Sequence, residues 1–155
     1  MNKLKTIALD DTIVALLLDE FKQFAAVPDD STDKMLESVL RTALLRVQEY
    51  ADTALVQTVL ELTTEPDGDG LVRLYEGGGR IIRLTTADGG SVAYIAQGSD
   101  VVKVQTTGTV VVRWQTMPSD GDLNELKPTV FRYGLAIYDG ETTEVLNGIL
   151  NEALC

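Results

Sequence analysis

The spacing of apolar residues changes from helical to strand-like in the middle of the chain, and this change limits the possible folds more than any other feature of the sequence. Between residues 55 and 118, short runs rich in β-branched residues are separated by Gly- and Asp-containing turns about every 8–12 residues. The runs cover residues 56–63, 71–75, 81–85, 92–95, 101–104 and 109–114. Because no helical stretch interrupts them, parallel strands with long crossovers are disfavoured. The segment therefore predicts antiparallel hairpins built from five to six short strands.

Apolar residues before this segment recur every three or four positions, which is the spacing of one helix face. This spacing predicts a first helix that Pro28 ends and a second helix that Asp30 can cap, with Asp33 favouring its positive N-terminus. The second helix carries a long apolar stripe formed by Leu36, Val39, Leu40, Ala43, Leu44 and Val47. We expect this stripe to be the core of the helical part, packed against the helix that begins at Pro128.

The helical period returns after residue 122. Pro128 suits the first helical position, where its missing N–H costs nothing, and apolar residues continue this helix to residue 138. A last amphipathic stretch over residues 145–154 places Leu146, Ile149, Leu150 and Leu154 on one face. This face could pack on its own domain, which is the commoner case, or dock on a partner. The predicted fold is thus α+β, with N-terminal helices, a segregated antiparallel β segment and C-terminal helices.

Length and composition favour one folded domain. The chain has 155 residues, of which 45% are hydrophobic, so it is long enough to bury a core and is not intrinsically disordered. We predict a single domain over residues 1–155, helical over 1–54, β over 55–118, and helical with a C-terminal docking segment over 119–155. Its net charge of −11 lies in the terminal zones, since residues 66–118 are neutral. Such an acidic chain should not bind a nucleic-acid backbone over a broad surface.

Several classes of enzyme and metal site are excluded by the residues that the chain lacks. It contains no histidine, which removes Ser-His-Asp and Cys-His nucleophile schemes and every histidine-based metal site. Its one cysteine, Cys155, allows neither a structural disulfide nor a cysteine cluster. The prediction is a protein that is not an enzyme, with no catalytic, metal or cofactor-binding residues.

Two glycine-containing segments resemble ligand-binding loops but are better explained as turns. Gly77-Gly78-Gly79-Arg80 lacks the Gly-Lys-Ser/Thr ending of a phosphate-binding loop and leads into a strand. Asp67-Gly68-Asp69-Gly70 begins like a calcium loop, but Gly78 stands where the bidentate acid would be needed. Hairpin and solvated turns are the simpler interpretation of both.

Charged clusters leave alternatives open. The aspartates beside helix starts or in turns could form a catalytic or magnesium-binding set, although capping explains each of them: Asp29, Asp30, Asp33, Asp120 and Asp122. Basic and aromatic residues of the β segment could bind single-stranded nucleic acid, although strand aromatics usually pack: Arg73, Arg80, Arg83, Lys103 and Arg113, with Tyr75, Tyr94 and Trp114.

The N-terminal residues give no sign of secretion or membrane insertion. Lys3 and Lys5 precede an apolar run at residues 13–18, but acidic pairs flank this run. A secretory apolar region needs about 7–15 residues and a membrane span about 20. A soluble protein made in a cytoplasm, with no membrane partner, is the expectation.

The whole order of elements resembles the head–tail connector (adaptor, or head-completion) proteins of long-tailed double-stranded-DNA bacteriophages. The likeness begins with a short helix over residues 17–24, an acidic loop at 27–33, and a long helix over 35–50 that ends in Val47-Gln48-Glu49-Tyr50. A β segment with strands like 57–63 and 109–115 follows, and then a Pro-initiated helix over 128–138. The early β segment lacks the family's Gly-Pro turn, and Trp114-Gln115-Thr116-Met117-Pro118 replaces its Tyr-x-x-Gly sequence.

The resemblance implies a structural virion protein at the head–tail interface, present in the host cytoplasm during assembly. Its members form a ring, commonly of twelve copies, beneath the portal protein. The ring extends the DNA channel without sequence-specific binding and receives the next neck or tail protein. The resemblance also implies that a C-terminal segment docks on the portal, which makes Leu146, Ile149, Leu150 and Leu154 the candidate interface residues. A nucleic-acid-binding module using the β segment, or another phage neck or tail protein, is the alternative.

Overall fold

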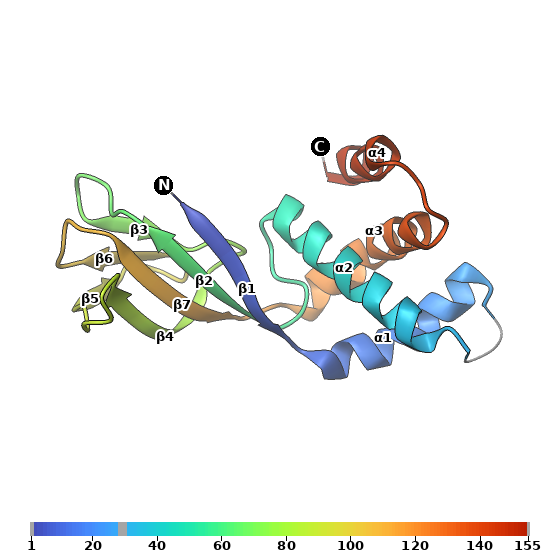
Figure 1. Ribbon diagram of the computed structural model, residues 1–155, viewed down its shortest axis with the longest axis horizontal. Coiled ribbons are helices and arrows are strands. Elements are labelled where there is room, and N and C mark those ends of the chain that lie inside the picture. The colour runs from blue at the N-terminus through green and yellow to red at the C-terminus, as the bar shows by residue number, and fades with distance from the viewer. Residues whose placement is uncertain (1, 28–30, 155) are drawn as a thin grey trace. The chain divides into compact units, whose positions relative to one another are not determined.

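The structure is a computed structural model that describes residues 2–27 and 31–154 (Figure 1). Its elements follow the order β1 (Lys3–Leu9), α1 (Asp11–Ala25), α2 (Asp33–Ala51), β2 (Thr58–Thr64), β3 (Leu71–Arg73), β4 (Gly79–Thr86), β5 (Tyr94–Ala96), β6 (Val101–Val104), β7 (Val110–Thr116), α3 (Asp120–Tyr138) and α4 (Thr143–Leu154). The α+β class, with its antiparallel β segment between helices, is confirmed. No helix among the described residues is both long and apolar enough to cross a membrane.

Contacts divide the chain into two compact units, each made from two separate stretches of sequence. The β unit comprises the strands, from described residues 2–9 and 56–118. The helical unit comprises α1 to α4, from described residues 10–27, 31–55 and 119–154. The prediction of one domain over residues 1–155 stays a prediction.

The β unit contains two antiparallel sheets. One sheet has the strand order β1-β2-β7-β4 and the other β3-β6-β5. Alternation is complete in β2 and β7, where every second side chain is buried and the side chains between are half-buried. The buried residues of both sheets join one core, formed by Leu60, Leu62, Val72, Leu74, Leu84, Val102, Val104, Val110, Val112 and Trp114. The two sheets are therefore held together by a shared apolar interior.

Strand β1 corrects the prediction that residues 1–54 are helical throughout. Residues Lys3–Leu9 pair with β2, with Lys3 opposite Thr63 and Lys5 opposite Glu61. The strand lies at the edge of its sheet, and most of its side chains are exposed. An edge strand buries few residues, so its apolar alternation is too weak to reveal it from sequence.

The helical unit is built around the predicted stripe of α2. Leu36, Leu40, Ala43, Leu44 and Val47 are fully buried, and Val39 is half-buried. Helix α2 packs against α3, as predicted, and also against α1 and α4. The rings of Phe21 on α1 and Phe131 on α3 lie 5.5 Å apart, which adds an aromatic contact to this core.

Helix α3 begins well before Pro128, so the predicted start of this helix is wrong. Ser119 caps the helix by accepting a hydrogen bond from the Asp122 N–H at 3.2 Å, and Asp120 and Asp122 lie in the first turn. Both features stabilise a helix N-terminus, which explains the early start. Pro128 lies inside the helix. The predicted cap of α2, Asp30, lies outside the described residues.

Candidate functional site

Helix α4, the predicted docking segment, packs against α3 and α2 of the helical unit. Of the four candidate interface residues, Leu150 is buried, with 5% of its surface exposed. Leu146, Ile149 and Leu154 are half-buried. The apolar face of α4 is thus used partly within its own unit, and three of its residues keep surface available to a partner.

Two polar contacts near the C-terminal end of α4 join it to α2 and α3. The Tyr50 hydroxyl of α2 donates a hydrogen bond to Asn151 Oδ1. Arg132 of α3 forms an ion pair with Glu152 at 3.3 Å. These groups are exposed, so each contributes little stability alone, but together they fix the orientation of α4 on its neighbours.

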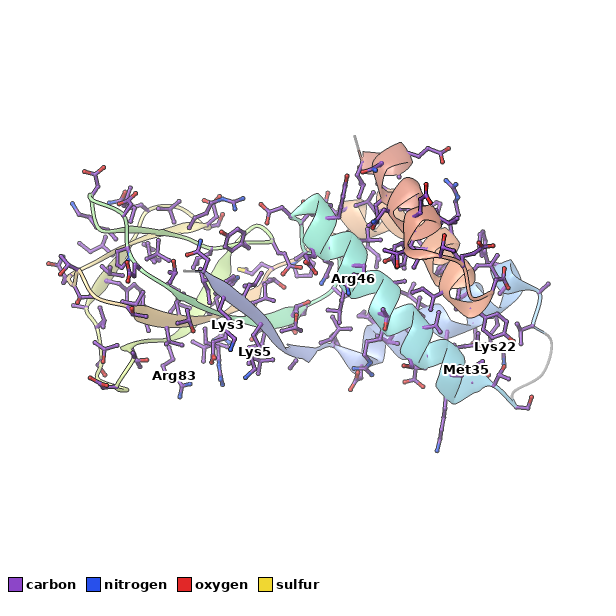
Figure 2. The ribbon with its side chains drawn as sticks, turned by 45° about the horizontal axis from the view of Figure 1, so that its top comes forward. Lys3, Lys5, Lys22, Met35, Arg46 and Arg83 are labelled. Carbon is purple, nitrogen blue, oxygen red and sulfur yellow. The ribbon has the colours of Figure 1, made fainter. Side chains whose placement is uncertain are left out.

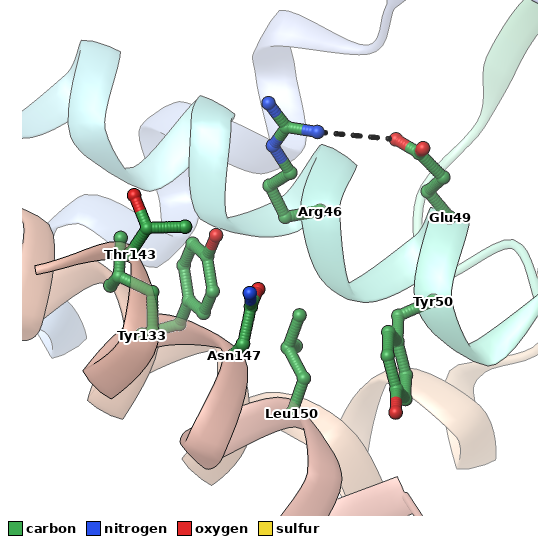
Figure 3. Close-up of a pocket in the computed structure, with 8 residues that line it drawn as sticks. Arg46, Glu49, Tyr50, Tyr133, Thr143, Asn147 and Leu150 are labelled. Carbon is green, nitrogen blue, oxygen red and sulfur yellow. Dashed lines mark ion pairs between the residues drawn. The ribbon is translucent and has the colours of Figure 1, made fainter.

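A cleft of about 590 Å³ lies between α2, α3 and α4 (Figure 3). It is lined by Arg46, Glu49, Tyr50, Tyr133, Thr143, Leu146, Asn147 and Leu150. Arg46 and Glu49 form an ion pair across 3.7 Å on its α2 side. The lining combines two apolar side chains of α4 with amide, hydroxyl and charged groups, and it contains no nucleophile paired with a general base.

Both glycine-containing loops are turns, but the predicted hairpin at Gly77-Gly78-Gly79 is wrong, because β3 pairs with β6 and β4 pairs with β7. Among the described strands of residues 55–118, only β5 and β6 form a hairpin of consecutive strands. In the β3–β4 turn, a Cβ added to Gly78 would lie 1.9 Å from the Ser99 carbonyl oxygen, so the backbone there is already in close contact with another turn. In the other loop, Asp67 Oδ1 accepts hydrogen bonds from the N–H groups of Asp69 and Leu71, both at 2.9 Å. The Asp67 carboxylate therefore stabilises its own turn.

The acidic residues considered as a catalytic or metal-binding set are separated in the structure. Asp33 pairs with Lys22 at 2.8 Å, whereas Asp120 and Asp122 lie in the first turn of α3. Asp29 and Asp30 lie outside the described residues. Among the residues that the structure describes, no group of three or more acidic or cysteine side chains is placed to hold a metal ion.

The basic residues of the β segment fall into two groups. Arg80, Arg83 and Arg113 lie on the four-stranded sheet, whereas Arg73 and Lys103 lie on the three-stranded sheet. The aromatic residues do not accompany the first group: Trp114 is fully buried in the core, and Tyr75 lies under the Arg73 guanidinium at 4.8 Å. The stacking platform proposed for single-stranded nucleic acid is therefore absent from the described part of this sheet.

Two basic residues that the sequence interpretation missed join Arg80, Arg83 and Arg113. Lys3 and Lys5 of β1 lie on the same face of the sheet, because their register partners Thr63 and Glu61 also face outward. We call these five residues the basic sheet face: Lys3, Lys5, Arg80, Arg83 and Arg113. The spacing of Lys3 and Lys5, two residues apart, is the one sequence signal for this placement. It indicates a shared face only if residues 3–9 form a strand, in which alternate side chains lie on the same face.

The fold as a whole is similar to chains of gene transfer agent particles. One is in the neck of an empty gene transfer agent particle computed with C6 symmetry, with a TM-score of 0.65, 17% sequence identity, and coverage of 97% of this chain and 94% of that chain. Another is in the virion of a native gene transfer agent particle, with a TM-score of 0.67 and the same identity and coverage. No protein-family profile and no curated protein matches the sequence. At this identity the likeness shows the α+β fold.

Proposed function

We propose that the protein is a non-enzymatic structural component of the neck of a tailed, phage-like particle. The observation that carries this proposal is the likeness in fold, which extends over 97% of this chain, to chains of a gene transfer agent neck and virion. Because the likeness covers both the helical and the β elements, it concerns the whole chain rather than a common supersecondary motif. The chain's resemblance in element order to head–tail connector proteins supports the same role.

The finer proposal is a homo-oligomeric ring beneath the portal protein. In that position the ring joins the capsid to the next neck or tail protein and extends the DNA channel, in the virion and at the head–tail interface. A ring of twelve copies is compatible with the C6 symmetry with which the similar neck was computed, since twelve is divisible by six. DNA would pass through without sequence-specific contacts, and assembly would take place in the host cytoplasm.

Mass photometry and negative-stain imaging test this proposal with the protein alone and mixed with its cognate portal. A ring of twelve 16.8 kDa chains has a mass of about 200 kDa, and it should be seen free or as an addition to the portal. A protein that stays monomeric in both samples, and adds no mass to the portal, would contradict the proposal.

Docking of α4 on the portal is a separate part of the proposal. The half-buried residues Leu146, Ile149 and Leu154 are the appropriate ones to change, because Leu150 contributes to the core of the helical unit. Leu154→Gln should weaken portal attachment at least tenfold and leave the melting temperature nearly unchanged. Leu150→Ala is the matched control, which should lower the melting temperature through loss of core packing. If Leu154→Gln attaches normally, α4 packs only within its own unit.

A further inference from the structure

The basic sheet face is continuous across all four strands. Lys5 of β1 lies opposite Glu61 of β2, which lies opposite Arg113 of β7, which in turn lies opposite Arg83 of β4. Strand neighbours are about 4.8 Å apart, so this row spans roughly 14 Å. Lys3 and Arg80 extend the charge along β1 and β4. Figure 2 shows Lys3, Lys5 and Arg83 gathered along one side of the β unit.

A single carboxylate lies within this face. Glu61 Oε2 accepts hydrogen bonds from Arg113 Nε at 3.1 Å and Arg113 Nη2 at 2.6 Å, and Arg83 Nη2 is 4.0 Å away. Glu61 therefore orients the Arg113 guanidinium, lies close to that of Arg83, and neutralises only one charge. The other six acidic residues of the β unit lie outside these four strands. The face keeps a net charge of about +4 in a unit that is neutral as a whole.

The complementary charge is found on the helical unit of the same sequence. Segments 1–9 and 56–118 hold seven basic and seven acidic residues, whereas segments 10–55 and 119–155 hold six basic and seventeen acidic residues. Five of those six cations already have acidic partners: Lys22, Arg41, Arg46, Lys127 and Arg132. The entire net charge of −11 is thus carried by the helical unit, with a large excess of carboxylates over cations.

The α3–α4 connection and the first turn of α4 hold an exposed group of these acids. Asp139, Glu141 and Glu144 lie within six residues and are all exposed. In the described part of the chain, no ion pair joins any of the three to a cation. The acids at the start of α3 differ, because Asp120 and Asp122 already complement that helix N-terminus.

We propose that the basic sheet face of one copy binds the α3–α4 connection of a second copy. This interface would join different surfaces of identical chains. That it closes a ring rests on the proposed neck function. Such a heterologous contact produces a closed ring when the rotation between copies closes. The pairing would set the register and direction of the ring, since reversal of one copy places like charges together.

The observations favour a second copy over nucleic acid as the occupant. A nucleic-acid duplex would have to approach a chain with a net charge of −11, and the face offers no exposed aromatic side chain among its five cations. The helical unit of a second copy carries seventeen acidic and six basic residues, so it supplies the local negative charge that the basic sheet face complements.

Charge reversal on the two edge-strand arginines tests the basic sheet face. Arg80→Glu with Arg83→Glu should weaken self-association at least tenfold, measured by analytical ultracentrifugation and mass photometry. Arg73→Glu with Lys103→Glu is the matched control, because it changes the charge of the β unit equally on the other sheet. The control should self-associate like the wild type. Wild-type association should weaken between about 0.1 M and about 1 M salt, as the Debye length falls from about 10 Å to about 3 Å.

A mixing experiment then identifies the partner surface. Asp139→Lys with Glu141→Lys should weaken association as strongly as the arginine reversal does. When the two disabled variants are mixed, each basic surface again meets an acidic one, so rings with alternating subunits should form. Recovery in the mixture, and in a chain that carries all four changes, would not occur if either variant were simply misfolded.

Three results would overturn the inference. The first is a wild type that stays monomeric alone at both salt concentrations, and the second is a ring that both reversals leave intact. The third is salt-sensitive binding of a DNA duplex that only the arginine reversal abolishes, with the ring unaffected, since this would assign the face to nucleic acid. In the second and third results the ring survives, so the proposed neck function would stand although the interface fails.

Discussion

Gly134 of α3 lies directly against the ring of Phe21 of α1. A Cβ added at Gly134 would be 2.9 Å from Phe21 Cζ and 3.1 Å from Phe21 Cε1, closer than packed carbon atoms approach. The absence of a side chain at Gly134 therefore lets α3 and α1 approach each other at the centre of the helical unit. The neighbouring contact between the Phe21 and Phe131 rings depends on this approach.

Gly134→Ala should destabilise the helical unit. Alanine is intrinsically better than glycine in a helix by about 0.5–1 kcal/mol, but overpacking a core costs about 1–3 kcal/mol, so a net loss of about 1–2 kcal/mol is expected. Urea unfolding followed by far-ultraviolet circular dichroism measures it. Gly148→Ala on α4 is the control, because nothing lies within 4 Å of its added Cβ and the change should stabilise. Equal stabilisation by both changes would contradict the close approach.

Leu40→Ala should be the more severe core change. Leu40 is fully buried on α2, and loss of a buried leucine side chain lowers the free energy of unfolding by about 2–5 kcal/mol. Leu16→Ala on α1 serves as the comparison, since 67% of Leu16 is exposed and its truncation should change stability by less than about 0.5 kcal/mol. Denaturant midpoints that are similar for the two variants would show that Leu40 is not in the core.

Asp67 should act through its hydrogen bonds and not through a metal ion. Asp67→Ala removes the acceptor for the Asp69 and Leu71 N–H groups and should cost about 1–2 kcal/mol, whereas Asp67→Asn keeps a carbonyl acceptor and should cost less. Calcium, magnesium or chelator should leave the wild-type melting temperature unchanged in a thermal shift assay. A rise in melting temperature with calcium, lost when Asp67 and Asp69 are both changed to Asn, would instead establish a cation site.

Glu61→Gln should loosen the centre of the basic sheet face. It removes the charge that orients Arg113, and the expected loss of stability is about 1–2 kcal/mol in low salt and smaller in about 1 M salt. Glu65→Gln, at an exposed site just after β2, should have almost no effect. A Glu61→Gln protein that is as stable as the wild type at both salt concentrations would show that the ion pair contributes nothing to the sheet.

The helical stripe and the β segment could be predicted because each follows from one local period. Leu36 to Val47 repeat at helical spacing and are buried as a set, and the strand runs lie between turns that glycine and aspartate make easy to recognise. The start of α3 was misplaced because Pro128 suits a first turn, yet the Ser119 cap and its acidic neighbours start the helix earlier.

The basic sheet face could not be predicted, since it depends on strand order. Lys5 and Arg83 are distant in sequence and share a face only because β1 and β4 form the two edges of one sheet. Register decides which side chains share a face, and a shift of one residue would turn Arg113 inward and Trp114 outward. The candidate α4 residues were easier to select because a single helix face contains them all.

The chain leaves and re-enters each unit, and this interleaving governs how the protein can be made and cut. Strand β1 is synthesised before α1 and α2, and its partner β2 only after them. Likewise, α3 is synthesised only after the whole β segment, although it packs against α2. Neither unit can therefore finish folding on the ribosome while the chain is half made. No single cut yields either unit as an intact fragment, so a truncation meant to isolate the β unit must delete residues 10–55, rejoin the flanking ends and end the chain after residue 118.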